Sequence, residues 1–286
     1  MDFHSVAAQL RKAGREVNYP NMLLSQQAFA DQHEPEPFET VSVSRDLAYG
    51  RDQRHRLDIF THDEADGPRP ILLFVHGGGF VRGDKQVPGT PYNDNVGLFA
   101  ARNGMVGVTM THRLAPDHPW PAGGDDVGEA VHWLAKNGAE FGGDPARIFL
   151  LGTSAGATHA ATAIAQGKHQ VAGAILLSGI YDFTDPALHD VLAPYLTEET
   201  SSYSAKSPLD ELVDSDLPLM LVMAELDPPE FERQTFGLAG RLLERRGVMP
   251  HLVRLPGHNH FTAALHLNGS DRWLGERIVD FVTQLA

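Results

Sequence analysis

From residue 71 onward, the sequence alternates short, continuous apolar runs with longer segments that have the apolar spacing of helices. A short apolar run is typical of a strand that is buried on both faces, as in a parallel sheet. Because helices separate the strands, the pattern predicts an α/β fold with a mostly parallel central sheet and helices on both faces. The strands are expected at 71–75, 105–110, 147–151, 171–179, 217–224 and 251–257, and the helices at 93–104, 125–141, 157–167, 232–247 and 271–286.

Three regions lie outside this alternation. Residues 1–40 are polar with helix-like apolar spacing, whereas 41–60 alternates apolar and polar residues as strands do. Residues 182–216 are rich in Pro, Ser, Asp and Glu, which predicts an irregular surface excursion. No linker or repeat divides the chain, so we expect one domain over 1–286, with small cap elements from 1–40 and 182–216.

Ser154 lies in the motif GTSAG, between the strand expected at 147–151 and the helix expected at 157–167. G-x-S-x-G between a strand and a helix is the pattern of a nucleophile elbow, a sharp turn that exposes a serine hydroxyl. Side chains at Gly152 and Gly156 would press on the neighbouring strand and helix. The motif alone is equally typical of an ordinary turn, and its position favours the catalytic interpretation.

The stretch HGGGF, residues 76–80, directly follows the apolar run ILLFV. Consecutive glycines are costly to order, but they let bare backbone N–H groups approach a ligand closely. A serine that attacks an acyl group creates a negative oxygen that needs such donors. The N–H groups of Gly78, Gly79 and Ala155 are therefore predicted to form an oxyanion hole; a flexible glycine loop is the alternative.

A nucleophilic serine also needs a base and a carboxylate that orients the base. In hydrolases with a nucleophile elbow the order along the chain is serine, acid, histidine. The strand expected at 217–224 is followed by two acids, Glu225 and Asp227, and the last expected strand by two histidines, His258 and His260. His76 precedes the serine and is out of order. The residue pattern alone does not decide which of the two acids and which of the two histidines takes part.

Several motifs together resemble the α/β-hydrolase esterases of the hormone-sensitive-lipase-like group: HGGGF, HRLAPDHPWPAGGDDV, GGDPARIFLLGTSAGA, AELDPP and GHNHF. VNYPNMLLSQQAF and LAYGRDQRHRLDIF are similar to related esterases of the kynurenine formamidase type. The resemblance covers roughly residues 40–286. It is specific for the α/β-hydrolase fold and its machinery, and much less so for the substrate.

The resemblance implies roles for particular residues. The aspartate of AELDPP, Asp227, is implied as the acid, and the second histidine of HNHF, His260, as the base. The oxyanion donors carry over to Gly78, Gly79 and Ala155. The formamidase type usually has an aromatic residue where this chain has Gly79, which favours an ester hydrolase.

Like Gly79, His112 departs from the family's pattern, because a tyrosine often stands at this position, just before the RLAP motif. The RLAPDHPWPA stretch itself is interpreted as structural, with Arg113 paired to Asp117.

We therefore expect a serine carboxylic-ester hydrolase that acts through an acyl-enzyme on short-chain or compact aromatic esters. An arylformamidase or amidase with the same triad is one alternative. A non-catalytic binding protein on a hydrolase scaffold is another, which the complete triad disfavours. The residues expected to line the substrate pocket are Phe80, Trp120, Phe183, Tyr195 and Phe261, with Leu192 and Leu196 beside them.

Composition bounds the remaining possibilities. A formal net charge of −14 argues against a nucleic-acid partner, and the lack of cysteine excludes disulfides, thiolate metal sites and a cysteine nucleophile. No H-E-x-x-H spacing is present, so no metal or cofactor is expected. The absence of a long apolar run or a signal-peptide pattern predicts a cytoplasmic protein without a membrane span. The expected partner is a small-molecule ester, and a homodimer is left open.

Overall fold

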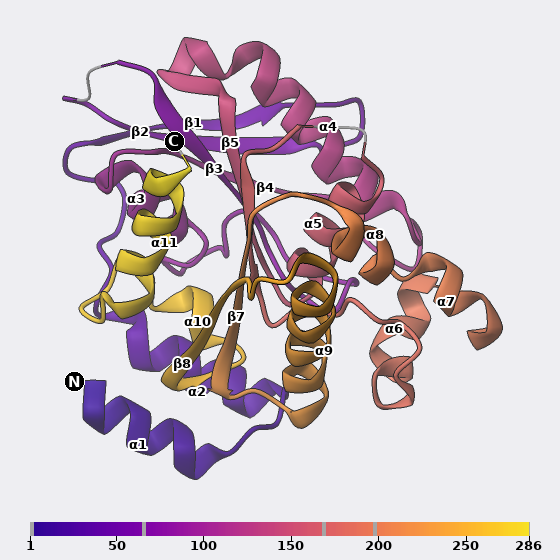
Figure 1. The fold of residues 1–286 in the computed structure, drawn as a ribbon. Coiled ribbons are helices and arrows are strands. Elements are labelled where there is room, and N and C mark those ends of the chain that lie inside the picture. Colours follow the sequence, from indigo (N-terminus) through magenta and orange to yellow (C-terminus); the bar gives the residue numbers. More distant parts are fainter. Residues whose placement is uncertain (1–2, 65–66, 168–169, 197–198, 286) are drawn as a thin grey trace.

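The computed structural model describes residues 3–64, 67–167, 170–196 and 199–285. These residues form one eight-stranded sheet in the order β1-β2-β4-β3-β5-β6-β7-β8 (Figure 1). β2 is antiparallel to both of its neighbours, and the other pairs are parallel. The predicted α/β fold is confirmed. The strands are β1 (Val41–Ala48), β2 (Arg56–His62), β3 (Arg69–Val75), β4 (Val106–Met110), β5 (Gly143–Thr153), β6 (Gly173–Leu177), β7 (Leu219–Leu226) and β8 (His251–Asn259).

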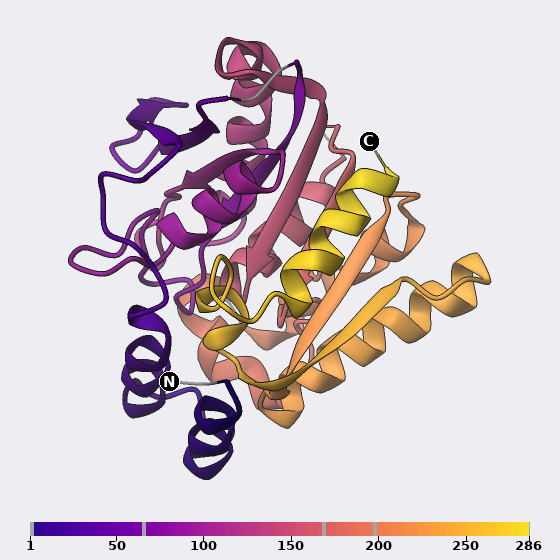
Figure 2. The same cartoon turned by 90° about the vertical axis from the view of Figure 1, so that its left-hand side faces the viewer.

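Helices cover both faces of the sheet, because side chains along a buried strand alternate between two apolar clusters. In β3, for example, Ile71 and Leu73 join one cluster, whereas Leu72 and Phe74 join the other. The first face is covered by α4 (Ala122–Asn137), α5 (Ala155–Ala165), α8 (Leu209–Asp214) and α9 (Pro229–Arg246). The second face, seen in Figure 2, is covered by α3 (Asp94–Arg102), α10 (Thr262–Leu265) and α11 (Trp273–Gln284).

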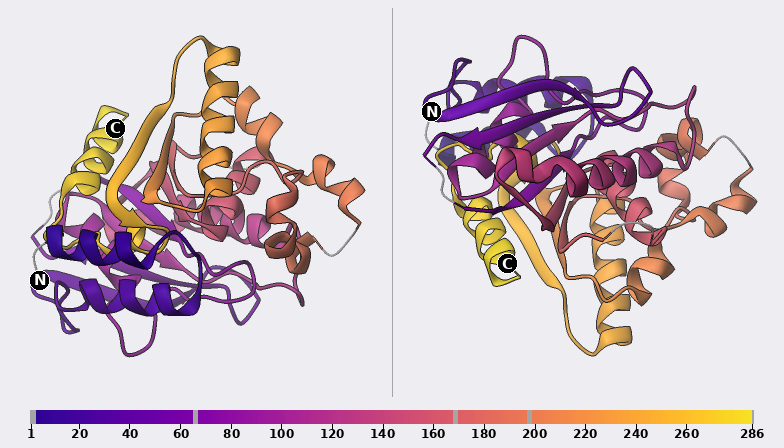
Figure 3. Two further views of the ribbon diagram at one scale, coloured as in Figure 1. Left: turned by 90° about the horizontal axis from the view of Figure 1, so that it is seen from below. Right: turned by 90° about the horizontal axis from the view of Figure 1, so that it is seen from above.

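The N-terminal segment forms two helices, α1 (Phe3–Ala13) and α2 (Tyr19–Ala30), which lie side by side (Figure 3, left). The side chain of Asn18 caps α2 by accepting a hydrogen bond from the backbone N–H of Asn21, as N-cap residues do. Leu10 and Phe29 pack with Leu226, the last residue of β7. The two helices therefore lie against the carboxyl end of the sheet.

The prediction that 182–216 is irregular is wrong. The described residues of this segment form short helices: η2 (Pro186–Leu188), α6 (His189–Leu196), η3 (Thr200–Ser202), α7 (Tyr203–Lys206) and α8. Leu188, Leu192 and Tyr195 recur at helical spacing and are fully or almost fully buried. Frequent Pro and carboxylate residues obscure this spacing in the sequence. α6 and α7 extend to one side of the sheet (Figure 1).

The parallel strands place four separate chain segments at one edge of the sheet. HGGGF follows β3, Ser154 follows β5, Asp227 follows β7 and His260 follows β8. Because β3, β5, β6, β7 and β8 run in the same direction, their carboxyl ends meet there. Across the described ranges, every helix is too short or too polar to span a bilayer.

Candidate active site

Ser154 occupies a strained turn between β5 and α5, with φ of 53° and ψ of −124°. Its backbone N–H donates to the carbonyl of Leu177 at 2.8 Å, which ties the turn to β6. A Cβ on Gly152 would stand 2.6 Å from the Cα of Ala157, and one on Gly156 would stand 2.1 Å from the carbonyl oxygen of Val75. The predicted crowding at both glycines is confirmed, and it explains how the chain turns so sharply.

The ring of His260 lies between Ser154 and Asp227. Its Nε2 is 2.9 Å from Ser154 Oγ, and its Nδ1 is 2.8 Å from Asp227 Oδ1. The other carboxylate oxygen of Asp227 accepts from the Ser178 hydroxyl at 2.6 Å and from the Ala224 N–H at 2.7 Å. Asp227 is fully buried, and His260 is 5% exposed. The structure thus brings the three predicted residues into one hydrogen-bonded chain.

These contacts determine which ring nitrogen of His260 carries the proton. An ionised carboxylate only accepts hydrogen bonds, and Asp227 also accepts from Ser178 and Ala224. His260 Nδ1 must therefore carry the proton. The lone pair on Nε2 then faces the hydroxyl of Ser154, and this arrangement is able to withdraw the hydroxyl proton.

The alternative acid and base have other partners. Arg11 donates to both carboxylate oxygens of Glu225, at 2.8 and 3.0 Å. This hydrogen-bonded pair, with the Gly257 N–H, lowers the pKa of Glu225 to about 2. His258 is hydrogen-bonded to Thr262 and Asp271. Glu225 and His258 thus serve to hold neighbouring segments together.

The glycine loop lies directly against the serine turn. A Cβ on Gly77 would be 2.9 Å from the carbonyl oxygen of Thr153, and one on Gly78 would be 2.0 Å from that of Arg82. Gly78 and Gly79 also have positive φ values of 136° and 59°, which favour glycine. Ala155 is the first residue of α5, so its N–H has no acceptor within the helix. The three residues predicted as oxyanion donors therefore lie around the turn that carries Ser154.

Three buried histidines lie beside this loop. The ring of His112 stacks on that of His76 at 4.3 Å and meets the edge of His159 at 4.5 Å. Burial lowers the pKa of all three below the ordinary histidine value, so that they are neutral at pH 7. His112 therefore fills a packed aromatic layer at the position where the family often has tyrosine.

The predicted pairing of Arg113 with Asp117 is wrong. The guanidinium of Arg113 donates to both carboxylate oxygens of Asp126 in α4, at 2.6 to 3.1 Å. Asp126 is fully buried and also accepts from the Arg113 N–H at 2.7 Å. Asp117 lies exposed in the turn that precedes α4. The helix thus brings the more distant aspartate to Arg113.

Most of the residues predicted to line the pocket are packed in the core beside the site. Phe80, Phe183 and Tyr195 are at most 1% exposed, and the rings of Phe80 and Tyr195 stack at 4.4 Å. They therefore offer no surface in an open cavity, because α6 packs directly on the loop that carries Phe80. Leu192 and Leu196 are equally buried. Trp120 packs on this cluster and Phe261 lies beside His260, and both are only partly buried.

A cavity of about 480 Å³ lies next to the triad. Phe231 lines it and also packs on the ring of His260, with 4.5 Å between ring centroids. Val191 lines it too, and its Cγ2 is 4.0 Å from where a Cβ on Gly79 would stand. The remaining lining residues are Arg15, Glu16, Val17, Ala187, Leu188, Asp190, Pro228, Pro229 and Glu230. The cavity therefore adjoins both His260 and the glycine loop.

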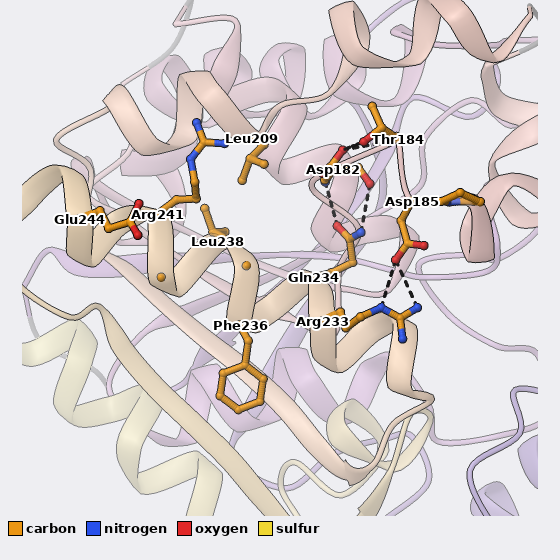
Figure 4. Close-up of a pocket in the computed structure, with 13 residues that line it drawn as sticks. Asp182, Thr184, Asp185, Leu209, Arg233, Gln234, Phe236, Leu238, Arg241 and Glu244 are labelled. Carbon is orange, nitrogen blue, oxygen red and sulfur yellow. Dashed lines mark hydrogen bonds and ion pairs between the residues drawn. The ribbon is translucent and has the colours of Figure 1, made fainter.

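A second cavity, of about 680 Å³, lies along α9 (Figure 4). Arg233 and Asp185 form an ion pair on its wall, and the amide of Gln234 bonds to the backbone of Asp182. Among the described residues that line it, none is hydrogen-bonded to the triad or packs on its ring, whereas Phe231 of the smaller cavity packs on His260. We therefore assign the smaller cavity, and not this one, to the site.

Three residues at the site were not predicted. Ser178 bonds to Asp227, Phe231 packs on His260, and Arg15 donates to the backbone carbonyl of Asp227 at 3.2 Å. Ser178 has a detectable signal, because it is a polar residue directly after a buried strand that lies between those of the serine and the acid. Arg15 and Phe231 have no such signal.

Comparison with known proteins identifies the family to which this fold belongs. A family model described as alpha/beta hydrolase fold matches residues 72–263. Esterase LipI of Mycobacterium tuberculosis is 41% identical over 112 residues, which are 39% of this chain and 32% of LipI. Esterase LipQ of the same organism is 26% identical over 277 residues, 87% of this chain and 64% of LipQ. The chain thus spans about a third to two thirds of the length of these relatives.

Solved structures of similar fold include esterase B of Lactobacillus rhamnosis inhibited by a tributyrin phosphonate. Its TM-score is 0.76 at 18% identity, over 100% of this chain and 96% of that one. A thermostable esterase of Pseudomonas putida gives a TM-score of 0.72 at 21% identity, over 98% and 95%. Since the family model covers well over half of the sequence and the sheet has the same fold, the chain belongs to the α/β-hydrolase fold family.

Proposed function

We propose that this protein is a serine carboxylic-ester hydrolase whose triad is Ser154, His260 and Asp227. The observation that carries the proposal is the His260 ring, hydrogen-bonded to Asp227 on one side and to Ser154 on the other. The intact chain of hydrogen bonds favours an enzyme over a binding protein on the same scaffold. The names of the similar proteins, esterases LipI and LipQ, support the same activity.

In the first half of the proposed reaction, Ser154 Oγ attacks the ester carbonyl as its proton passes to His260 Nε2. The backbone N–H groups of Gly78, Gly79 and Ala155 stabilise the oxyanion that forms. His260 then gives its proton to the leaving alcohol, and an acyl group remains bonded to Ser154. While the His260 ring holds this proton and is positively charged, Asp227 stabilises it.

In the second half, water attacks the acyl group with His260 as the base. The same N–H groups hold the second oxyanion, and its collapse breaks the bond to Ser154 Oγ. The serine recovers its proton from His260, and the carboxylic acid leaves. Each bond that forms or breaks is thus assisted by a residue already in place.

The proposed substrates are esters with a short acyl chain or a compact aromatic group. The cavity of about 480 Å³ that adjoins His260 supports this size. The two segments proposed as cap elements contribute to the walls of this cavity. Arg15 and Val17 come from the N-terminal segment, and Leu188 and Val191 come from 182–216. Charged residues share these walls, and such walls do not suit a long lipid chain.

A series of p-nitrophenyl esters from acetate to palmitate tests the substrate range. Each buried methylene contributes about 0.8 kcal/mol, so kcat/KM is expected to rise over the first few carbons and to fall once the cavity is filled. Val191→Phe narrows the cavity and should move the optimum to a shorter chain. Val248→Phe, at a position that is 70% exposed, is the control and should leave the optimum unchanged.

Two results of this series would contradict the proposed substrate class. One is an optimum at long chains, and the other is activation by an oil–water interface. N-formylkynurenine should be cleaved more slowly than the best ester, and a faster reaction would favour an arylformamidase that uses the same triad.

A further inference from the structure

A cluster of metal-binding residue types lies behind the last strand, apart from the triad. It consists of His258 in β8, His266 after α10 and Asp271 before α11. One ligand atom from each residue lies within 4.8 Å of the others. His258 Nε2 is 3.0 Å from Asp271 Oδ2, and the two histidine rings are 4.2 Å apart between centroids.

The two ring nitrogens of His266 have different surroundings. Its Nδ1 lies 2.7 Å from the backbone carbonyl oxygen of Thr262, which only accepts hydrogen bonds, so Nδ1 carries the proton. In the neutral ring, Nε2 is then the unprotonated nitrogen. The residue is fully buried, and this atom has no hydrogen-bond partner within the described ranges. A buried acceptor without a donor is costly unless something else binds it.

The other two residues are held in place by hydrogen bonds of their own. His258 Nδ1 is 3.1 Å from the hydroxyl of Thr262, and Asp271 Oδ1 accepts from the Trp273 N–H at 3.0 Å. Metal-binding histidines are usually oriented in this way, with one nitrogen hydrogen-bonded and the other on the metal. Both histidines of the cluster therefore have their Nδ1 engaged, while Nε2 of His258 is hydrogen-bonded to Asp271 and Nε2 of His266 has no hydrogen-bond partner among the described residues.

We propose that His258 Nε2, His266 Nε2 and Asp271 Oδ2 bind a divalent transition-metal ion, for which Zn²⁺ is the best match. Two imidazole nitrogens and one carboxylate oxygen, with water in the fourth position, form a common set of zinc ligands. Ligand atoms around tetrahedral zinc stand about 3.3 Å apart, so the separations in the cluster, which are at most 4.8 Å, have to shorten by no more than about 1.5 Å.

The cluster also has an entry path. Asp271 lines a cavity of about 320 Å³ together with Asn268 and Arg272, and its side chain is 14% exposed. An ion that enters there meets Asp271 before it reaches the two buried histidines. The sequence did not predict this site, because the three residues lack a regular spacing and only the fold brings them together.

A metal ion bound at this site would stabilise the fold around the last strand. A bound ion would tie the end of β8 to the segments that follow α10 and precede α11, and His260 lies between them. Since the metal binds the folded form, it should raise the temperature of unfolding. Its binding does not depend on the proposed hydrolase activity and is measured separately from it.

The test uses the full chain, stripped with EDTA and titrated with ZnCl₂ by calorimetry, with the unfolding temperature followed in parallel. We expect one tight site per chain and a higher unfolding temperature with zinc. Asp271→Asn removes a ligand at a partly exposed position with little change of shape, and should weaken this binding at least about 100-fold. His266→Gln should do the same, and His62→Gln, in β2 away from the cluster, is the matched control and should bind as the wild type does.

Two outcomes would overturn the proposal. One is wild-type affinity and stoichiometry in Asp271→Asn that is folded by circular dichroism. The other is zinc binding by the wild type that is no tighter than weak binding to exposed histidines. A crystal soaked in ZnCl₂ should show an anomalous peak between the three ligand atoms, and a peak elsewhere alone would also contradict the proposal.

Discussion

Asp227 is the residue on which the geometry of the site depends most. Its carboxylate takes hydrogen bonds from His260, Ser178 and the Ala224 N–H, all within 2.8 Å. An amide in the same place would lack the negative charge, and its NH₂ group would donate a hydrogen bond. The His260 ring would then be free to adopt the wrong tautomer, with its proton on the nitrogen that faces Ser154.

We therefore predict that Asp227→Asn keeps the fold and lowers kcat/KM by about 10⁴-fold, the loss known for the equivalent change in a serine protease. Glu225→Gln is the matched control and should retain activity within a few-fold, because Glu225 binds Arg11 and Gly257. Steady-state kinetics on one p-nitrophenyl ester measure both. If Glu225→Gln were the crippling change, the assignment of the acid would be wrong.

Ser178 is a positioning residue for Asp227. It adopts a positive φ of 49° after β6, and its hydroxyl is 2.6 Å from Asp227 Oδ2. A hydrogen bond to a charged group contributes roughly 1.5 kcal/mol, so Ser178→Ala should lower kcat about tenfold. KM should stay within about twofold, because Ser178 does not line the cavity. An unchanged kcat, or a change in KM alone, would show that Ser178 does not act through Asp227.

At the scale of residues, short motifs in the sequence predicted the turn at Ser154 correctly, whereas contacts between residues far apart in the chain were missed. GTSAG predicted Ser154 and its crowded glycines because strand, turn and helix are adjacent in the chain. Ser178 and Asp227 are 49 positions apart, and no local pattern links them. The pairing of Arg113 was wrong for the same reason, since α4 brings Asp126 to it.

At the scale of elements, the N-terminal helices are hydrogen-bonded to the two strands that precede Asp227 and His260. Arg11 in α1 bonds to Glu225 in β7, and Glu225 also accepts from the Gly257 N–H in β8 at 2.7 Å. Arg15, between the two helices, donates to the backbone carbonyls of Glu225 and Asp227. Two arginines thus hold this segment at the carboxyl edge of the sheet.

This anchoring should make stability depend on pH through Glu225. Its pKa is about 2 in the folded protein, against an ordinary value of 4.5, so the ionised group stabilises the fold above about pH 4.5. That contribution is lost as the pH falls toward 2. We predict a lower urea midpoint for Glu225→Gln than for the wild type at pH 7, with a difference that narrows between pH 4.5 and 2.

Urea unfolding at several pH values measures the difference in midpoint between Glu225→Gln and the wild type. Glu244→Gln, on the exposed side of α9, is the control and should unfold at the same urea concentration as the wild type. A difference that persists unchanged down to pH 2 would show that the ionised carboxylate of Glu225 is not the stabilising group.

Strands that are buried on both faces were predictable, whereas the short helices of 182–216 were not. The apolar runs 71–75 and 105–110 appear as β3 and β4, because a strand between two layers of helices has no polar face. In 182–216 only some residues of each α-helix are buried, and η3 has no buried residue. The apolar residues of this segment are therefore sparse, and the segment looks irregular in the sequence.

At the scale of the whole molecule, strand order is what assembles the site. The alternation of strands and helices predicted a parallel sheet, but not the order β4-β3-β5-β6-β7-β8 or the register of each pair. Those depend on how helices pack on each face, which involves residues far apart in the chain. The family match over 72–263 covers this framework, whereas α1 and α2 lie outside it.

The central claim is that Ser154 is the nucleophile of a serine hydrolase, and an active-site-directed phosphonate tests it most directly. A fluorophosphonate should add to wild-type protein at one equivalent, and peptide mass spectrometry should find it on Ser154 as esterase activity disappears. Ser154→Ala should take up no label and lose activity by about 10⁴-fold or more, while its unfolding temperature stays close to that of the wild type. Labelling at another residue, together with activity retained in Ser154→Ala, would contradict the account.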